Sequence, residues 1–267
     1  MKKLQNTYCK SNKKLWDQLT KTHIDDPFYN VKDFLAGANT LKNPELLLLN
    51  DVKGKSILHL QCHFGLDTLS LARLGGEVTG VDFSSEAVRQ ARELVDRANI
   101  SAEFLESDAY ELSGRLEKKF DLVFTSYGVL SWLPDLPEWA RTVREMLKPG
   151  GYFILVEFHP FLNLIGDDPV CFAFDYFERK EPVQTELSQS YTGKKLPQKM
   201  EEYNWNHSLS TILKSLLSVG LALEVFEEYD YSPFRCFENM VERAPGEYVW
   251  DVGVSIPYLF AIKMEKH

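Results

Sequence analysis

The segment SILHLQCHFGLDTLSLARLGGEVTGVDFS, residues 56–84, decides the fold expected of this chain. Its first apolar run, residues 57–60, predicts a buried strand followed by a compact turn. Leucines at nearly helical spacing then predict a helix that ends at the glycine pair 75–76. A second apolar strand, residues 78–81, leads directly into Asp82. The order strand, turn, helix, strand and acid is typical of a nucleotide-binding βαβ unit.

Two features of this unit bear on the ligand. The N–H groups at the start of the helix face the ligand, and an acid at the end of the second strand can accept hydrogen bonds from ribose hydroxyls. Asp82 is therefore the first candidate binding residue. A dinucleotide loop has the pattern G-x-G-x-x-G, whereas here Gly65 stands without the other glycines, and no Lys-Ser/Thr phosphate loop is present. A pyrophosphate would lack its cradle, which disfavours a nicotinamide cofactor.

The turn resembles the first motif of class I S-adenosylmethionine-dependent methyltransferases, acid-x-Gly-x-Gly-x-Gly. His59 stands in place of the motif's acid, and Gln61 and His63 stand in place of two glycines, while Gly65 and Asp82 keep their places. The resemblance implies that S-adenosylmethionine is the cofactor and S-adenosylhomocysteine its product. The cofactor contacts that it implies in this first unit are His59, Leu60, Gln61, His63, Gly65, Thr68, Asp82 and Phe83.

Later segments extend the resemblance over roughly residues 55–160. The apolar run FDLVFTS, residues 120–126, predicts a central parallel strand, and LKPGG at 147–151 precedes a further strand. In the family, an acid after the third strand binds the adenine amino group, and the loop after the fourth strand meets the cofactor and often the acceptor. The resemblance therefore adds Asp108, Ala109, Ser126 and Tyr127 to the cofactor candidates, although Asp108 could instead cap a helix.

The expected fold is α/β, a doubly wound, seven-stranded, mostly parallel sheet with an antiparallel β insertion after the fifth strand. Two closing strands, 223–229 and 258–264, match the antiparallel pair that ends the sheet in this family, whereas nicotinamide-binding Rossmann domains lack it. The loop between them, residues 232–257, is expected to be irregular.

The chain is expected to have three parts. Residues 1–50 form an N-terminal helical lid that brings Trp16 to the cofactor, or else simply pack Trp16 onto the sheet. Residues 51–160 and 207–267 form the methyltransferase domain. Residues 161–206 form an inserted β cover on the acceptor side, because residues 171–177 and 183–187 alternate with the period of two that strands show. Its alternative is a dimerising or stabilising hairpin. We expect some of its aromatic side chains to line the acceptor site: Phe172, Phe174, Tyr176, Tyr191, Tyr203 and Trp205.

Composition limits the binding partners, the metal sites and the cellular location expected of the chain. The chain has 267 residues and a formal net charge of −9, with no long basic run, which argues against phosphate-driven nucleic-acid binding. Four separated cysteines without metal-ligand spacing, no secretory leader and no apolar run of membrane-spanning length predict a cytoplasmic protein without a metal site. The sequence leaves open whether the chain acts as a monomer or as a homodimer.

The expected function is methyl transfer to an oxygen, nitrogen or carbon atom of a small molecule. In-line transfer from a sulfonium depends mainly on alignment, and a general base is needed only when the acceptor must lose a proton. His159 and His207 are the candidates for that base, each also readable as a structural or capping histidine. The alternatives are a cofactor-binding protein that has lost transfer and a nicotinamide-dependent oxidoreductase.

Overall fold

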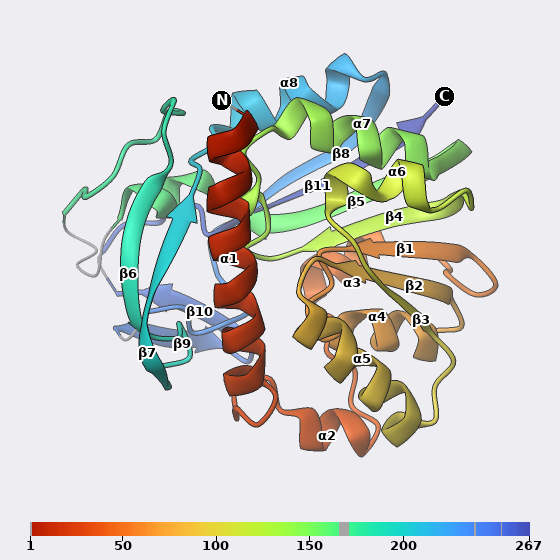
Figure 1. Cartoon of the computed structure of the whole chain (residues 1–267), viewed down its shortest axis with the longest axis horizontal. Helices are drawn as coiled ribbons and strands as arrows, with labels where there is room; N and C mark the ends of the chain where they lie inside the picture. The colour runs from red at the N-terminus through yellow and green to blue at the C-terminus, as the bar shows by residue number, and fades with distance from the viewer. Residues whose placement is uncertain (1, 166–170, 238, 252) are drawn as a thin grey trace.

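The computed structural model describes residues 2–165, 171–237, 239–251 and 253–267. Its central sheet has seven strands in the order β3-β2-β1-β4-β5-β11-β8 (Figure 1). The first five in chain order are parallel where they pair, and β11 runs antiparallel to both β5 and β8. The expected fold class is confirmed. The strands are β1 (Ser56–Leu60), β2 (Glu77–Asp82), β3 (Glu103–Glu106), β4 (Phe120–Ser126), β5 (Leu147–Phe158), β8 (Leu221–Tyr229) and β11 (Leu259–Lys266).

Helices cover both faces of the sheet. On one face Leu58 and Leu60 share a core with α7 and α8, and on the other Ile57 shares a core with α3 and α4. Consecutive residues of a strand point to opposite faces, so a fully buried strand such as β1 contributes to both cores. The helices are α3 (Asn43–Leu48), α4 (Leu66–Arg73), α5 (Ser85–Ala98), α6 (Leu112–Arg115), α7 (Leu136–Met146) and α8 (Leu209–Ser218).

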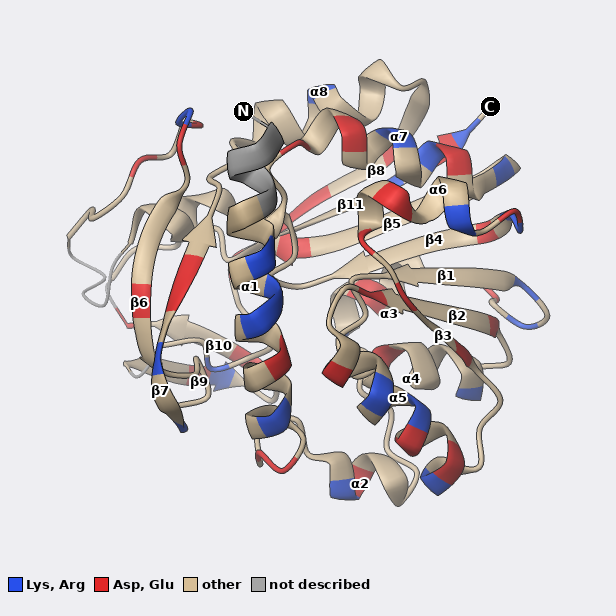
Figure 2. Ribbon diagram, viewed as in Figure 1, with Lys and Arg blue, Asp and Glu red and all other residues tan. Residues whose placement is uncertain are grey.

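The N-terminal segment runs across one end of this sandwich. Helix α1 (Lys2–His23) is one continuous helix that packs against α5 and against strand β7 of the insertion, and α2 (Val31–Leu35) follows it (Figure 1). Figure 2 marks both acidic and basic positions along α1 and α5. Among the described residues, none of the helices combines the length and the apolar character that a membrane span requires.

The insertion after β5 is a two-stranded antiparallel hairpin, β6 (Val183–Gln189) and β7 (Lys195–Asn204), preceded by the 3₁₀ turn η3 (Pro160–Leu164). The strand expected at residues 171–177 is wrong, because that segment makes only an isolated bridge between Phe172 and Ile165. Alternation alone did not distinguish a strand from an aromatic-rich loop. Residues 166–170 lie outside the described part of the chain.

A second hairpin, β9 (Met240–Ala244) and β10 (Glu247–Trp250), lies in the loop that was expected to be irregular. Its turn at Gly246 has a φ of 76°, which glycine adopts without a steric penalty. Trp250 and Tyr258 pack with Met240 in a small core of their own. The strands were missed because they are only five and four residues long and carry several charged side chains.

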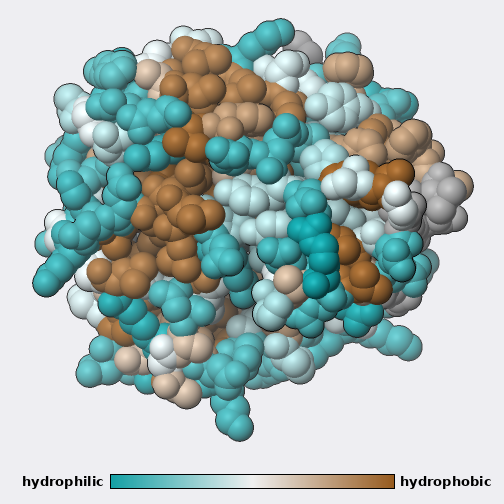
Figure 3. Space-filling model, turned by 180° about the vertical axis from the view of Figure 1, so that it is seen from behind, coloured by the Kyte–Doolittle hydropathy of each residue, from teal (hydrophilic) through white to brown (hydrophobic). Residues whose placement is uncertain are grey.

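The edge of the sheet and the back of the molecule expose apolar side chains beside charged ones (Figure 3). Leu46 and Leu47 on α3 and Leu223 on β8 are exposed. Edge strand β8 also carries Glu224, Glu227 and Glu228. Charged side chains on an edge strand disfavour pairing with a further strand, so the sheet ends there.

The ring of Phe104 on β3 lies over two glycines and thereby fixes the turn after β1. A Cβ atom added at Gly80 would come within 2.4 Å of the ring, and one added at Gly65 within 2.5 Å. Gly65 begins α4 with a φ of 81° in the left-handed region, where glycine is also favoured for its backbone. The turn after β1 therefore packs directly against β2 and β3.

We expect Gly80→Ala to lower the free energy of unfolding by about 1–3 kcal/mol, because the Phe104 ring must move to admit a methyl group. Gly114→Ala is the matched control: an added Cβ there meets nothing within 4 Å, and alanine is favoured in a helix. Urea unfolding followed by circular dichroism measures both. Equal destabilisation of the two variants would contradict the close approach of the ring.

Candidate functional site

A cavity of about 740 Å³ lies at the carboxyl ends of the parallel strands, between the sheet, α1 and the insertion. Ligands bind at this edge in open α/β sheets. Leu60 and Thr68 lie behind the wall, since Leu60 is fully buried in the core and Thr68 hydrogen-bonds the Nδ1 atom of His59 at 2.8 Å. The remaining cofactor candidates line the cavity: Trp16, His59, Gln61, His63, Gly65, Asp82, Phe83, Asp108, Ala109, Ser126 and Tyr127.

The turn after β1 keeps a left-handed backbone at two positions where the methyltransferase motif has glycine. Gln61 has a φ of 55° and His63 a φ of 50°, a conformation that costs a non-glycine residue about 1–2 kcal/mol. The side chain of Gln61 compensates: its amide donates to the carbonyl of Val129 at 3.2 Å and accepts from the indole of Trp139 at 3.2 Å. The altered residues therefore tie the turn to the loop after β4 and to α7.

His63 joins the turn to α1 and to the insertion. Its Nε2 atom lies 3.1 Å from Nδ1 of His23, and Nε2 of His23 lies 2.6 Å from the hydroxyl of Ser190. Burial lowers the pKa of both imidazoles, that of His23 to about 4, so both rings are neutral near pH 7 and one can donate to the other. Three segments that are distant in sequence are thus held at one point.

Asp82 has the geometry that ribose binding needs. One carboxylate oxygen accepts the N–H of His63 and the other that of Ser84, each at 2.8 Å. A carboxylate oxygen has two acceptor sites, so each retains one for a ribose hydroxyl. Burial raises the pKa of Asp82 to about 6. The side chain is nearly buried and faces the cavity, and the residues present fit the ribose of S-adenosylmethionine.

Asp108 lies at the same end of the cavity and also caps a short turn. Its Oδ1 atom accepts the N–H of Tyr110 at 3.0 Å, at the start of η1 (Ala109–Glu111). Burial raises its pKa above the usual range of an aspartate. The cap occupies one oxygen and leaves Oδ2 for a ligand, so a contact with the adenine amino group stays a prediction.

The two histidines proposed as bases are held by structural contacts. Nδ1 of His159 accepts the N–H of Phe161 at 3.0 Å, and its Nε2 pairs with Glu228 at 2.9 Å, on the β8 side of the sheet. His207 lines the cavity, but its Nε2 atom lies 2.8 Å from the carbonyl of Leu133. Burial lowers the pKa of both rings. These contacts favour the capping and structural interpretation of both residues.

Sequence reasoning missed Glu157, a buried acid at the end of β5. Its carboxylate accepts the N–H groups of Gly128, of Val129 at 2.8 Å and of Leu130 at 3.0 Å, as well as that of Phe158 at 2.7 Å. These bonds fix the loop after β4, which lines the cavity. The available signal was the single acid in the apolar run YFILVEF of residues 152–158.

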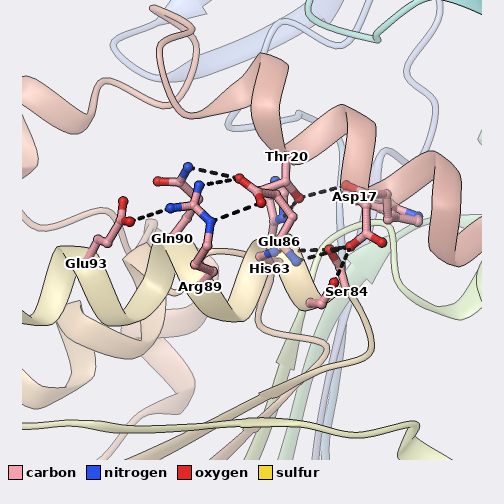
Figure 4. A network of polar contacts seen from close by, with 11 residues as sticks. Asp17, Thr20, His63, Ser84, Glu86, Arg89, Gln90 and Glu93 are labelled. Atoms are coloured by element: carbon pink, nitrogen blue, oxygen red, sulfur yellow. Dashed lines mark hydrogen bonds and ion pairs between the residues drawn. The ribbon is translucent and has the colours of Figure 1, made fainter.

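Helix α1 is also fastened to α5. The Oδ1 atom of Asp17 accepts hydrogen bonds from the hydroxyl of Ser84 at 2.6 Å and the N–H of Glu86 at 3.1 Å, and Thr20 lies 3.5 Å from His63 (Figure 4). An acid near a helix N-terminus is stabilised by the N–H groups there. Asp17 of α1 therefore helps to cap the N-terminus of α5. No spacing of residues along the chain indicated this contact.

Comparison with known proteins supports the same assignment. A family model described as a methyltransferase domain matches residues 57–151, the unit from β1 to β5. With the fold and the site, this match over residues 57–151 supports a class I S-adenosylmethionine-dependent methyltransferase. A ubiquinone biosynthesis O-methyltransferase from Xanthomonas euvesicatoria is 25% identical to this methyltransferase over 199 residues, which are 74% of this chain and 76% of that protein.

Solved structures share the fold of this methyltransferase. An S-adenosylmethionine-dependent methyltransferase from Mesorhizobium loti has a TM-score of 0.56 and 19% identity, over 87% of this chain and 100% of that one. One from Clostridium acetobutylicum has a TM-score of 0.57 and 16% identity, over 94% and 96% of the two chains. The family model covers neither the N-terminal helices nor the insertion.

We expect Asp82→Ala to weaken S-adenosylhomocysteine binding at least about tenfold, because each hydrogen bond to a charged carboxylate contributes about 1.5–3 kcal/mol. With the pKa of Asp82 near 6, binding to the wild type should weaken as the pH falls through 6 and the carboxylate takes up a proton. Asp82→Asn should lack that step. Titration calorimetry measures all three, with the exposed Glu117→Ala as control; wild-type affinity in folded Asp82→Ala would remove Asp82 from the site.

Proposed function

We propose that this methyltransferase transfers its methyl group to an oxygen atom of a small acceptor with a flat, apolar body. The observation that carries the proposal is an aromatic wall in the cavity. Phe28 and Phe234 stack with their ring centres 5.6 Å apart, and Tyr127 meets Phe234 edge-on at 5.0 Å. All three line the cavity, and flat aromatic molecules pack well on such rings.

The choice of oxygen draws on the relatives. The Xanthomonas protein that matches three quarters of this chain is named as an O-methyltransferase. The cavity wall of the described residues also carries more acidic than basic side chains, which suits a cationic methyl donor. When bound, S-adenosylmethionine supplies an electrophilic methyl group on sulfur, and the protein's task is to align the acceptor and exclude water.

We further propose that residues 1–50 act as a lid and residues 161–206 as an acceptor-side cover. Trp16 of α1 and Trp205, which follows β7, both line the cavity, and Asn12 of α1 exchanges two hydrogen bonds with the backbone of Tyr203. Of the insertion's aromatic residues, Phe174, Tyr191 and Trp205 line the cavity. Phe172 is exposed, and Tyr203 instead packs against Tyr8 of α1.

The direct test is transfer of a labelled methyl group to a panel of small aromatic acceptors. Catechol and 4-nitrocatechol offer hydroxyl oxygens. Aniline instead carries an amine nitrogen on its benzene ring, and benzoate carries a carboxylate. We expect product on a phenolic oxygen. Transfer only to nitrogen or to the carboxylate would contradict the proposal, and a reaction without the enzyme gives the background.

The aromatic wall makes a separate prediction. Phe234→Ala should raise KM for a phenol about tenfold or more, because losing an aromatic contact and its buried area removes over about 1.4 kcal/mol of binding, and should leave S-adenosylhomocysteine affinity unchanged. Phe172→Ala is the matched control, because it truncates an exposed ring outside the cavity. Steady-state kinetics and calorimetry separate the two effects. An equal rise in KM for both variants would contradict an acceptor site at Phe234.

A further inference from the structure

Tyr127 at the cavity wall makes an unusual contact with a carboxylate behind it. Its hydroxyl donates a hydrogen bond of 2.6 Å to Oε2 of Glu45 on α3, at the short end of the range for O–H···O bonds. Tyr127 has a φ of 42°, a left-handed conformation that is uncommon for a bulky residue and often found at functional sites. Strand β4 ends at Ser126, so the backbone conformation of Tyr127 determines where its ring lies.

Glu45 is an unexpected residue at this depth. It is fully buried, and α3 packs it toward β5 and β11, where Leu48, Val156 and Ala261 share a core. Its Oε2 atom also accepts the N–H of Lys42 at 3.2 Å. Its Oε1 atom has no hydrogen-bond partner among the described residues. A buried carboxylate with an unused oxygen is costly to keep charged.

The charges around Glu45 favour its protonated form. Asp67 at the start of α4 repels it, and burial together with that repulsion raises the pKa of Glu45 to about 8. Tyr229 on β8 and Tyr231 beyond it are the other titratable side chains that face Glu45, and both are neutral near pH 7 because burial raises each phenol's pKa further. The positive charge of Lys42 acts mainly on Asp67.

We propose that Tyr127 and Glu45 form a proton-accepting pair for the hydroxyl group of the acceptor. Tyr127 is the member that touches the acceptor, since it lines the cavity, while Glu45 lies behind it. A phenol oxygen that donates its own proton still has lone pairs with which to accept one. The inference rests on the proposed transfer to oxygen.

The step balances in atoms and charge. The acceptor's O–H proton moves to Oη of Tyr127, whose own proton moves to Oε2 of Glu45. The acceptor oxygen uses its freed electron pair to form the O–CH₃ bond, while the pair of the breaking C–S bond stays on sulfur. The positive charge of the sulfonium and the negative charge of Glu45 disappear together, which suits a cavity with little water.

Several other acids and histidines near the cavity are committed to different contacts. Glu157 already accepts four N–H groups. His159 pairs with Glu228, and Asp82 holds the turn after β1. His207 is held at its Nε2 atom by the carbonyl of Leu133. Tyr127 with Glu45 combines a side chain on the cavity wall with a buried carboxylate able to take up the proton.

The test compares Tyr127→Phe and Glu45→Gln with the wild type on two phenols that differ in acidity. On catechol, whose hydroxyl must be deprotonated, we expect kcat to fall about 10²–10⁴-fold, the range that general-base catalysis contributes. On 4-nitrocatechol, whose hydroxyl ionises readily in water, the fall should be at least about tenfold smaller, since less proton transfer is needed. KM and S-adenosylhomocysteine affinity should change little in either variant, because both keep the ring or the shape of the side chain.

The pH profile gives a second readout. Only ionised Glu45 can accept a proton, so wild-type kcat on catechol should fall as the pH is lowered through about 8, and Glu45→Gln should lack that step. Tyr229→Phe is the matched control, because it removes a hydroxyl that faces Glu45 without a hydrogen bond to it, and it should keep wild-type kinetics. Equal losses on both phenols would assign the pair a structural role and overturn the proposal, as would unchanged kcat. A wild type that methylates no phenol would instead remove the proposed function itself.

Discussion

The carboxylate of Glu157 is the contact on which the architecture of the site depends. By accepting N–H groups of Gly128, Val129 and Leu130, it folds the loop after β4 back over the end of β5. That loop then receives the other parts: the backbone N–H of Trp205 donates to its Ser131 carbonyl at 2.8 Å, and Trp132 packs edge-on against Trp16 of α1 at 5.1 Å. A buried acid is stable only when its lone pairs are occupied, so the acid and the loop specify each other's position.

Helix α1 combines polar contacts with an apolar interface. Asn12 meets the insertion, Asp17 caps α5 and His23 meets both the turn after β1 and Ser190. Polar contacts of this kind contribute only about 0.5–1.5 kcal/mol each in net terms. Leu15 and Leu19 are buried and pack with Leu196 of the insertion, so burial of apolar side chains adds to these polar contacts in holding α1 against the insertion.

The side-chain contacts of Gln61 and His63 explain the departures from the glycine motif. Gln61 and His63 keep the left-handed backbone that glycine would adopt freely, and each uses its side chain to bond a neighbouring segment. Glycine could adopt this backbone conformation but could make no side-chain hydrogen bonds. These side-chain bonds link the turn to α1, to α7 and to the loop after β4, whereas a side chain cannot replace Gly65 in this way because the Phe104 ring occupies the space of its Cβ.

The sequence by itself determined the α/β class, the strands and helix of the βαβ unit and the place of Asp82, because apolar periodicity and turn residues act over neighbouring positions. It did not determine the strand assignment at residues 171–177, where alternating aromatic residues form a loop, nor the hairpin β9–β10, whose strands are short and charged. Only the tertiary structure decided that Glu157 holds the loop after β4, that His23 meets His63, and that Glu45 lies behind Tyr127. These contacts join residues that are 27–82 positions apart. Their energy comes from burial and hydrogen bonding after the chain has folded, and no local pattern encodes it.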